Sequence, residues 1–130
     1  AMDIHEWKLT ELKKRAKRNG AQNIQTKHIN STKVIKRLEN SADRVLLDVP
    51  CSGLGVIKRK PDSKWKLTPE FIEQIKKDQI EILENYSKMV KAGGALVYST
   101  CSMLPSENQN QVKKFIEKHP EFNGIRTTAM

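Results

Sequence analysis

The stretch RVLLDVPCSGLG, residues 44–55, contains the transition that decides the fold. Its first five residues form a short apolar run bounded by turn signals, which is typical of a buried strand. Asp48 ends this run, Pro50 and Cys51 follow almost at once, and a glycine turn comes next. A strand that only had to be buried needs neither the carboxylate nor the thiol, so both side chains are candidates for chemistry.

Helical and strand patterns alternate on both sides of this stretch. Apolar residues at helical spacing, and short apolar runs between turn residues, define the elements. Before this stretch we predict a helix over 5–19, a strand over 23–28 and a weaker helix over 32–38. The strand over 44–48 is followed by an irregular stretch over 49–67. After it we predict a long helix from Pro69 to about Lys91, a strand over 95–100 and a last helix that begins at Ser106.

The helix boundaries rest on particular residues. Thr68 and Pro69 suit the start of the long helix, because a hydroxyl can cap it and proline lacks only an N–H that would be unbonded there. We expect Gly93-Gly94 to end that helix. Ser106 and Gln109 have the form of a capping box for the last helix. On the long helix, the residues expected to face the core are Ile72, Ile75, Ile82, Tyr86 and Met89, and on the last helix Val112, Phe115 and Ile116.

This alternation predicts an α/β fold, with parallel strands joined by right-handed helical crossovers. Ligands in such sheets bind beyond the carboxyl ends of the strands. Asp48 and Cys51 follow one strand, and Cys101 follows the next strand along the chain. We therefore expect both thiols at the same rim of the sheet, although they lie far apart in the sequence.

The chemistry of two thiols at one rim is left open by their spacing. A single cysteine at a strand end is usually a small buried hydrophobe, but two at equivalent positions favour a function. A free thiol ionises near pH ~8.5, so a nucleophilic cysteine needs local help. Spacing alone does not choose between Cys51 and Cys101. A redox pair is an alternative, although neither thiol lies in a CxxC motif.

The charge of the chain points to an anionic partner. It carries 24 basic and 15 acidic residues, a net charge of +9, and nucleic acid is the usual partner for such a balance. One basic cluster lies in the helix over 5–19 and is equally consistent with a solvated helix surface. The other flanks Trp65 in the loop just after Cys51, where we expect contact with phosphates; its members are Lys58, Arg59, Lys60, Lys64 and Lys66.

Several classes of protein are disfavoured. No apolar run approaches the roughly 18 residues that span a bilayer, and no signal peptide is visible, so we expect a cytoplasmic protein that does not bind membranes. Two cysteines do not suggest a disulfide framework. No metal site is predicted, because the three histidines are scattered without ligand spacing.

Three segments and one tryptophan together carry a specific family resemblance. DVPCSGLG, the RKPD of residues 59–62, Trp65 and STCSMLPSENQNQV of residues 99–112 closely resemble the Sun (Fmu) family of RNA cytosine-5 methyltransferases. The resemblance extends to about Phe122. It implies a Rossmann-like class I methyltransferase sheet with helices on both faces. It also implies S-adenosylmethionine as cofactor and RNA as partner, with ribosomal RNA favoured over transfer RNA.

The resemblance also implies roles at the rim. Cys101 would be the nucleophile that adds to C6 of a cytosine, after which C5 takes the methyl group. Cys51 would assist release, and Asp48 would contact the cytosine edge close to the cofactor. Pro50 would fix the turn that aims them, since its φ is locked. For the cofactor, Asp3 matches the ribose-binding acid, and Asn30 stands where the family usually has an aspartate beside the adenine.

The family pattern extends beyond these residues. The glycine-rich cofactor loop, the first strand and the last strands have no counterpart in the sequence, so the resemblance implies that residues 1–130 are a partial, truncated catalytic domain. Missing strands leave neighbouring strands with unpaired edges. We therefore expect rearrangement, strand pairing across the gap, or dimerisation through exposed sheet edges. A catalytically inactive RNA-binding fragment is the alternative function.

Overall fold

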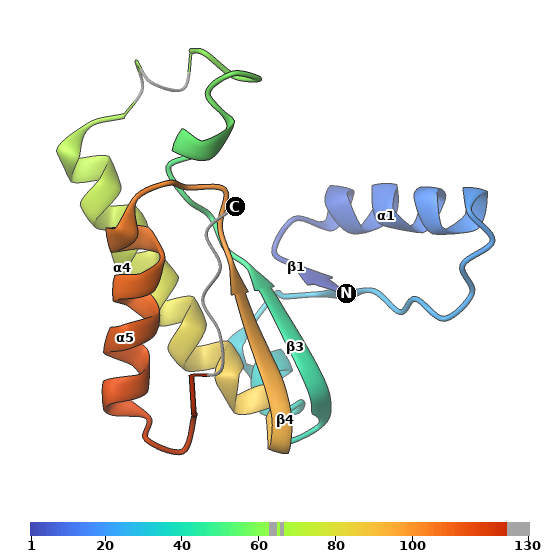
Figure 1. Ribbon diagram of the computed structural model, residues 1–130. Coiled ribbons are helices and arrows are strands. Elements are labelled where there is room, and N and C mark those ends of the chain that lie inside the picture. Colours follow the sequence, from blue (N-terminus) through green and yellow to red (C-terminus); the bar gives the residue numbers. More distant parts are fainter. Residues whose placement is uncertain (63–64, 66, 125–130) are drawn as a thin grey trace. The chain divides into compact units, whose positions relative to one another are not determined.

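The computed structural model describes residues 1–62, 65 and 67–124. The chain divides into two compact units, Ala1–Glu39 and Asn40–Met130, which are described separately (Figure 1).

The first unit is a small β-α-β-α arrangement. It contains β1 (Met2–Asp3), α1 (Glu6–Arg18), β2 (Lys27–His28) and α2 (Thr32–Lys36). The two strands are parallel, with Asp3 opposite His28. The helices predicted over 5–19 and 32–38 are confirmed, while only the last two residues of the strand predicted over 23–28 are paired. Gly20, with a φ of +67°, turns the chain out of α1 in the left-handed conformation that glycine tolerates.

The second unit contains two parallel strands with two helices packed on one face (Figure 1). Its elements are β3 (Ala42–Asp48), the 3₁₀ turn η1 (Leu54–Val56), α4 (Pro69–Tyr86), η2 (Ser87–Met89), β4 (Val90–Ser99), η3 (Pro105–Glu107) and α5 (Gln109–Lys118). The strands pair from Arg44 opposite Ala95 to Asp48 opposite Ser99. The predicted α/β fold with parallel strands is confirmed.

The core of the second unit lies between the sheet and α4. Val45 and Leu47 alternate along β3, Val49 directly follows the strand, and all three are buried. They face α4, whose buried positions are Ile75, Gln79 and Leu83, spaced by four residues. Of the residues expected on this face, Ile75 and Met89 are buried, whereas Ile72, Ile82 and Tyr86 are half-buried. On α5, Phe115 is buried as expected, and Val112 and Ile116 are half-buried.

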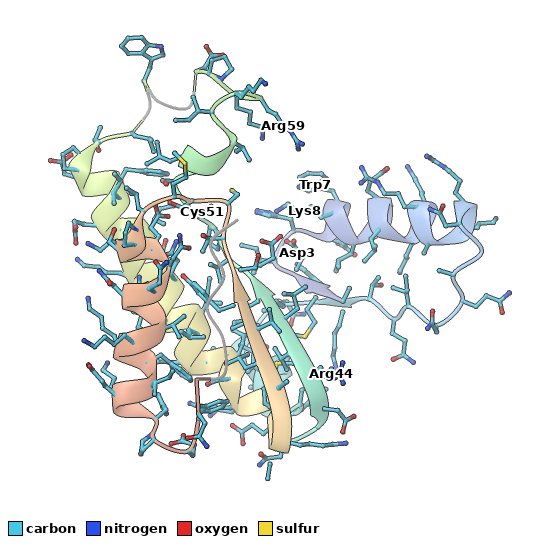
Figure 2. All side chains as sticks on the ribbon, in the orientation of Figure 1. Asp3, Trp7, Lys8, Arg44, Cys51 and Arg59 are labelled. Atoms are coloured by element: carbon cyan, nitrogen blue, oxygen red, sulfur yellow. The ribbon has the colours of Figure 1, made fainter. Side chains whose placement is uncertain are left out.

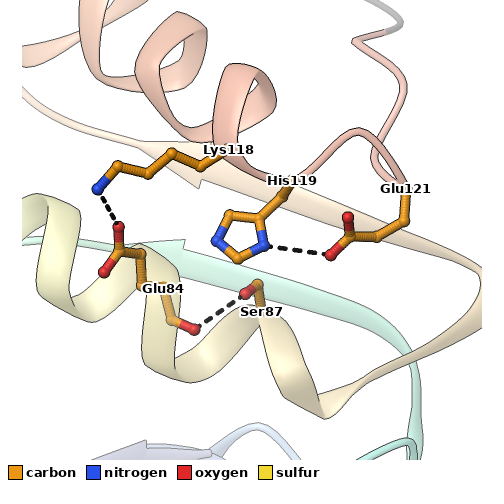
Figure 3. Close-up of polar contacts among 5 residues, drawn as sticks. All are labelled: Glu84, Ser87, Lys118, His119 and Glu121. Carbon is orange, nitrogen blue, oxygen red and sulfur yellow. Dashed lines mark hydrogen bonds and ion pairs between the residues drawn. The ribbon is translucent and has the colours of Figure 1, made fainter.

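Polar contacts join the C-terminal ends of α4 and α5 (Figure 3). Lys118 Nζ lies 2.9 Å from Glu84 Oε1, so one ion pair links the two helices. The His119 ring stacks on Phe115 with 4.6 Å between centroids, and its Nδ1 lies 3.1 Å from Glu121 Oε1. Ser87 donates to the carbonyl of Glu84 at 3.2 Å, closing the last turn of α4. The helix pair is thereby held at the end remote from the cysteines.

The expected end of the long helix at Gly93-Gly94 is wrong. The helix ends at Tyr86, and both glycines lie inside β4. The register shifts there, since Ala42 is opposite Val90 but Arg44 is opposite Ala95. Gly93 has a φ of +77°, which suits such a bulge. Pairing with β3 has therefore overridden the local glycine signal.

The capping box expected at Ser106 is also wrong. Residues Pro105–Glu107 form η3, and α5 begins at Gln109 with Asn108 at its N-terminal boundary. The physical reason is that the side chain of Glu107 is fully buried in contacts with distant residues. That tertiary role sets the backbone before α5.

The other face and edge of β3 remain open within the described residues. Leu46 and Val97 are 67% and 51% exposed, on the face opposite α4. The strands form two separate two-stranded sheets, so the expected pairing across the gap is not found in the described part of the chain. Dimerisation through the β3 edge stays a prediction. None of the described helices is both long and apolar enough to cross a membrane.

Candidate active site

The two cysteines meet beyond the ends of β3 and β4. Asp48 and Ser99 are the last paired residues of the strands, and each is followed within three residues by a cysteine. The Sγ atoms of Cys51 and Cys101 lie 2.9 Å apart, and both thiols are free. The expected meeting of the thiols at one rim is confirmed, and Figure 2 shows Cys51 at this end of the sheet.

Backbone contacts hold the two cysteine turns against one another. Val49 N donates to Ser99 O at 3.1 Å, which continues the sheet by one bond. Cys101 N then donates to Cys51 Sγ at 3.2 Å. Gly55 N donates to Cys101 O at 2.9 Å, and a Cβ on Gly55 would lie only 2.7 Å from that oxygen. The approach is closer than any other residue type would allow.

A buried carboxylate lies directly beneath the cysteines. Glu107 is fully buried, and it accepts hydrogen bonds from Ser52 N at 2.8 Å, Ser102 Oγ at 2.7 Å and Gln79 Nε2 at 3.0 Å. Gln79 Nε2 also donates to Pro50 O at 2.9 Å. Each buried polar group is thereby given partners, as interiors require.

A second set of contacts shapes the turn around Cys101. The Thr100 hydroxyl donates to Asn108 Oδ1, and it accepts from Ser102 N at 3.2 Å. Asn108 Nδ2 donates to Ser102 O at 2.8 Å. The residue before α5 therefore fastens both neighbours of Cys101.

The sequence reasoning missed Glu107 and Gln79 as site residues. The available signal was Gln79 itself, a polar residue four positions from both Ile75 and Leu83 on the buried face of α4. Glu107 lay within the quoted motif, but the sequence pattern assigned it no role and indicated a capping box at its neighbours Ser106 and Gln109. Gln79 and Glu107 are 28 residues apart in sequence, so only the tertiary structure reveals their contact.

The pKa values of Cys51 and Glu107 are shifted in opposite directions. Burial, together with the hydrogen bond with Cys101, raises the pKa of the Cys51 thiol to about 11. For Glu107, burial alone would raise the pKa, but the hydrogen bonds from Ser52, Ser102 and Gln79 outweigh it and hold the pKa below its ordinary value. Burial also raises the pKa of Tyr98. At neutral pH the site thus holds a protonated Cys51 and an ionised Glu107.

The candidate cofactor residues fall on both units. Asp3 and Asn30 belong to the first unit, where Asp3 ends β1 and Asn30 lies two residues beyond β2. Asp3 Oδ1 accepts from His5 N at 2.8 Å, and Asp3 Oδ2 lies 3.6 Å from Lys8 Nζ. Asn30 is exposed. Asp48 belongs to the second unit and is exposed at the end of β3.

The basic loop follows the cysteine turn. Lys58, Arg59 and Lys60 are all exposed just after η1, where Arg59 N and Lys60 N donate to the Val56 carbonyl (Figure 2). Lys64 and Lys66 lie outside the described residues. Trp65 is 80% exposed. The described part of this loop therefore presents the cations Lys58, Arg59 and Lys60 and an aromatic ring to solvent.

Solved structures define the class of protein to which this fold belongs. NSun6 from Pyrococcus horikoshii, solved with SFG, matches with a TM-score of 0.78 at 32% identity, over 91% of this chain and 30% of that chain. A methyltransferase homolog protein from the same organism matches with a TM-score of 0.73 at 32% identity, over 90% of this chain and 35% of that chain. The fold is that of a Rossmann-like methyltransferase.

Sequence comparison then gives the family. The family model described as 16S rRNA methyltransferase RsmB/F matches residues 1–130, and the chain belongs to this family. A probable ribosomal RNA small subunit methyltransferase B of Bacillus subtilis is 40% identical over 123 residues. That match covers 94% of this chain and 28% of the relative, so the chain spans under a third of the relative's length. The resemblance inferred from the sequence segments is confirmed.

Proposed function

We propose that residues 1–130 form part of the catalytic domain of an S-adenosylmethionine-dependent RNA methyltransferase. It transfers a methyl group to C5 of a cytosine, and its substrate is ribosomal RNA. The observation that carries the proposal is the contact between Cys51 and Cys101 beyond the ends of two neighbouring parallel strands. Membership of the RsmB/F family supports ribosomal RNA as the substrate.

Cys101 is the nucleophile in this proposal. It is exposed, whereas Cys51 is partly buried, so the target cytosine can reach the Cys101 sulfur more easily. The raised pKa of Cys51 keeps its proton in place at neutral pH. Because the sulfurs are 2.9 Å apart, the Cys51 S–H can donate to a Cys101 thiolate and stabilise it.

The reaction proceeds by addition and elimination. The Cys101 thiolate forms a bond to C6 of cytosine, and the electron pair of the C5–C6 double bond makes C5 a carbon nucleophile. When bound, S-adenosylmethionine would supply an electrophilic methyl group to C5 and would be left as S-adenosylhomocysteine. A base then takes the C5 proton, the S–C6 bond breaks and the double bond is restored, with Cys51 assisting release. Asp48 hydrogen-bonds the cytosine edge, and Pro50 restricts the intervening turn.

The residues present suit an S-adenosylmethionine-type cofactor. Asp3 and Asn30 follow the carboxyl ends of the parallel strands β1 and β2, where nucleotide ligands bind in such sheets. The Asp3 carboxylate retains lone pairs for ribose hydroxyls, and the Asn30 side-chain oxygen can accept from an adenine amine. A structural neighbour solved with SFG supports this type of cofactor.

The test is nucleoside analysis of modified RNA. We expect the full-length protein, given S-adenosylmethionine and unmodified small-subunit ribosomal RNA, to yield 5-methylcytosine by mass spectrometry. Transfer RNA serves as the comparison substrate. A methyl group on another base contradicts the C5 assignment, and RNA binding without any methylation favours the inactive RNA-binding alternative.

The basic loop should contribute to RNA affinity through phosphates. Replacing Arg59 and Lys60 together by alanine should make the slope of log K against log salt shallower by about 1.4, because two phosphates of single-stranded RNA would no longer be neutralised. Filter binding over a salt series measures this. Lys113→Ala with Lys114→Ala removes the same charge from exposed positions on α5 and should leave the slope unchanged. An unchanged slope in the loop variant excludes the contact.

A further inference from the structure

We propose that Glu107 is a positioning residue, whose buried carboxylate joins the two cysteine turns and so sets the distance between the Cys51 and Cys101 thiols. The geometric part stands on the hydrogen bonds alone. Its consequence for methyl transfer rests on the proposed function.

The two carboxylate oxygens of Glu107 serve different turns. Oε2 accepts from Ser52 N at 2.8 Å, and Ser52 directly follows Cys51. Oε1 accepts from Ser102 Oγ at 2.7 Å, and Ser102 directly follows Cys101. One rigid planar group therefore fastens the residue after each cysteine.

The serine hydroxyls add a direct link whose direction Glu107 determines. Ser52 Oγ and Ser102 Oγ lie 3.0 Å apart. Each hydroxyl has one proton, and that of Ser102 goes to Glu107. The Ser52 proton must then go to Ser102 Oγ, which also accepts from Leu104 N at 3.1 Å. The ordered chain Ser52, Ser102, Glu107 depends on an acceptor at its end.

Glu107 is itself fixed from two other sides. Gln79 Nε2 donates to its Oε2 at 3.0 Å and to Pro50 O at 2.9 Å, so α4 also holds the residue before Cys51. Tyr98 donates its hydroxyl proton to the Glu107 carbonyl at 2.8 Å, which ties the same residue to β4. The carboxylate is therefore anchored well enough to hold both turns.

Glu107 cannot be a catalytic residue, because its side chain is fully buried and its two oxygens already accept from protein donors. Its influence must pass through Ser52 and Ser102 to the neighbouring sulfurs. Without it, two backbone hydrogen bonds still join the two segments, from Val49 N to Ser99 O and from Gly55 N to Cys101 O. We expect those bonds to keep the strands together but to let the thiols drift apart.

The test measures thiol proximity in the full-length protein by oxidation with diamide. The reaction converts the Cys51 and Cys101 thiols to one disulfide, and the two hydrogens reduce the N=N bond of the reagent to a hydrazine. Mass spectrometry of linked peptides gives the rate of formation. We expect Glu107→Ala to slow it about tenfold, because misplaced groups lose effective molarity steeply.

Three variants separate positioning from simple destabilisation. Leu83→Ala lowers thermal stability through the core and should leave the rate of disulfide formation unchanged. Glu107→Gln keeps the shape and an acceptor oxygen, and should restore most of the wild-type rate. Ser102→Ala removes one arm only and carries the test if Glu107→Ala does not fold. If Glu107→Ala folds, disulfide formation at the wild-type rate in that variant overturns the proposal. If it does not fold, a wild-type rate in Ser102→Ala overturns it.

Kinetics connect the geometry to the proposed reaction. We expect Glu107→Ala to lower kcat for methyl transfer while leaving KM for RNA unchanged, because the variant keeps every residue that is expected to bind RNA. If wild-type protein methylates no RNA yet Glu107→Ala slows thiol coupling, the proposed function fails and the positioning role stands. If the wild-type protein methylates RNA and Glu107→Ala couples its thiols at the wild-type rate, the positioning role fails and the proposed function stands.

Discussion

Cys51→Ser in the full-length protein is expected to trap RNA on Cys101 as a covalent adduct. Addition should proceed in this variant, because Cys101 keeps its sulfur and the introduced hydroxyl can still donate to the thiolate. Release should be slow, because the Cys51 sulfur that lies 2.9 Å from the nucleophile is gone. Cys101→Ser should form no adduct, since serine is far less nucleophilic at neutral pH than a thiolate.

A denaturing gel measures the adduct directly. Each variant is incubated with S-adenosylmethionine and ribosomal RNA, and a protein band shifted by RNA marks the covalent species. We expect most of the Cys51→Ser protein in that band, little of the wild type and none of Cys101→Ser. The double variant is the matched control and should show none. An adduct in Cys101→Ser but not in Cys51→Ser reverses the roles of the two cysteines.

The position of both cysteines at one rim could be predicted because it follows from local strand signals and from the direction of the strands. A short apolar run ending in Asp48 identifies a buried strand, and parallel strands place their carboxyl ends together. These two facts predict that Cys51 and Cys101 lie close together, although they are 50 residues apart in the sequence. The start of α4 was likewise predictable from local residues. Thr68 accepts from Phe71 N at 3.2 Å, as its position before Pro69 indicated.

The errors arose where tertiary contacts override local signals. Gly93 and Gly94 have the residue type of a helix end, but the chain there is needed to pair with β3. Ser106 has the form of a helix cap, but burial of Glu107 beneath the cysteines sets the backbone instead. In each case a partner distant in sequence decides the outcome. A polar residue such as Gln79 on an otherwise apolar helix face is the sequence signal of such a partner.

Gly55→Ala is expected to reduce methyl transfer by roughly 100-fold, the loss typical of a displacement of about 1 Å at a reacting group. A Cβ at this position would lie 2.7 Å from Cys101 O and 3.2 Å from Cys101 C, and both atoms belong to the backbone. No flexible side chain can yield, so the turn that carries Cys101 must move. The hydrogen bond from Gly55 N to Cys101 O, 2.9 Å long, would strain with it.

The measurement is kcat with saturating RNA, together with the rate of disulfide formation between the thiols. Both kcat and the rate of disulfide formation should fall in Gly55→Ala. The same displacement separates the two sulfurs from one another and moves the Cys101 sulfur away from the cytosine ring. Gly93→Ala is the matched control. It introduces the same methyl group at a glycine with a φ of +77° and no atom within 4 Å, so it costs backbone strain without reaching either cysteine. Wild-type kcat in Gly55→Ala would show that the position of the Cys101 turn does not limit the reaction.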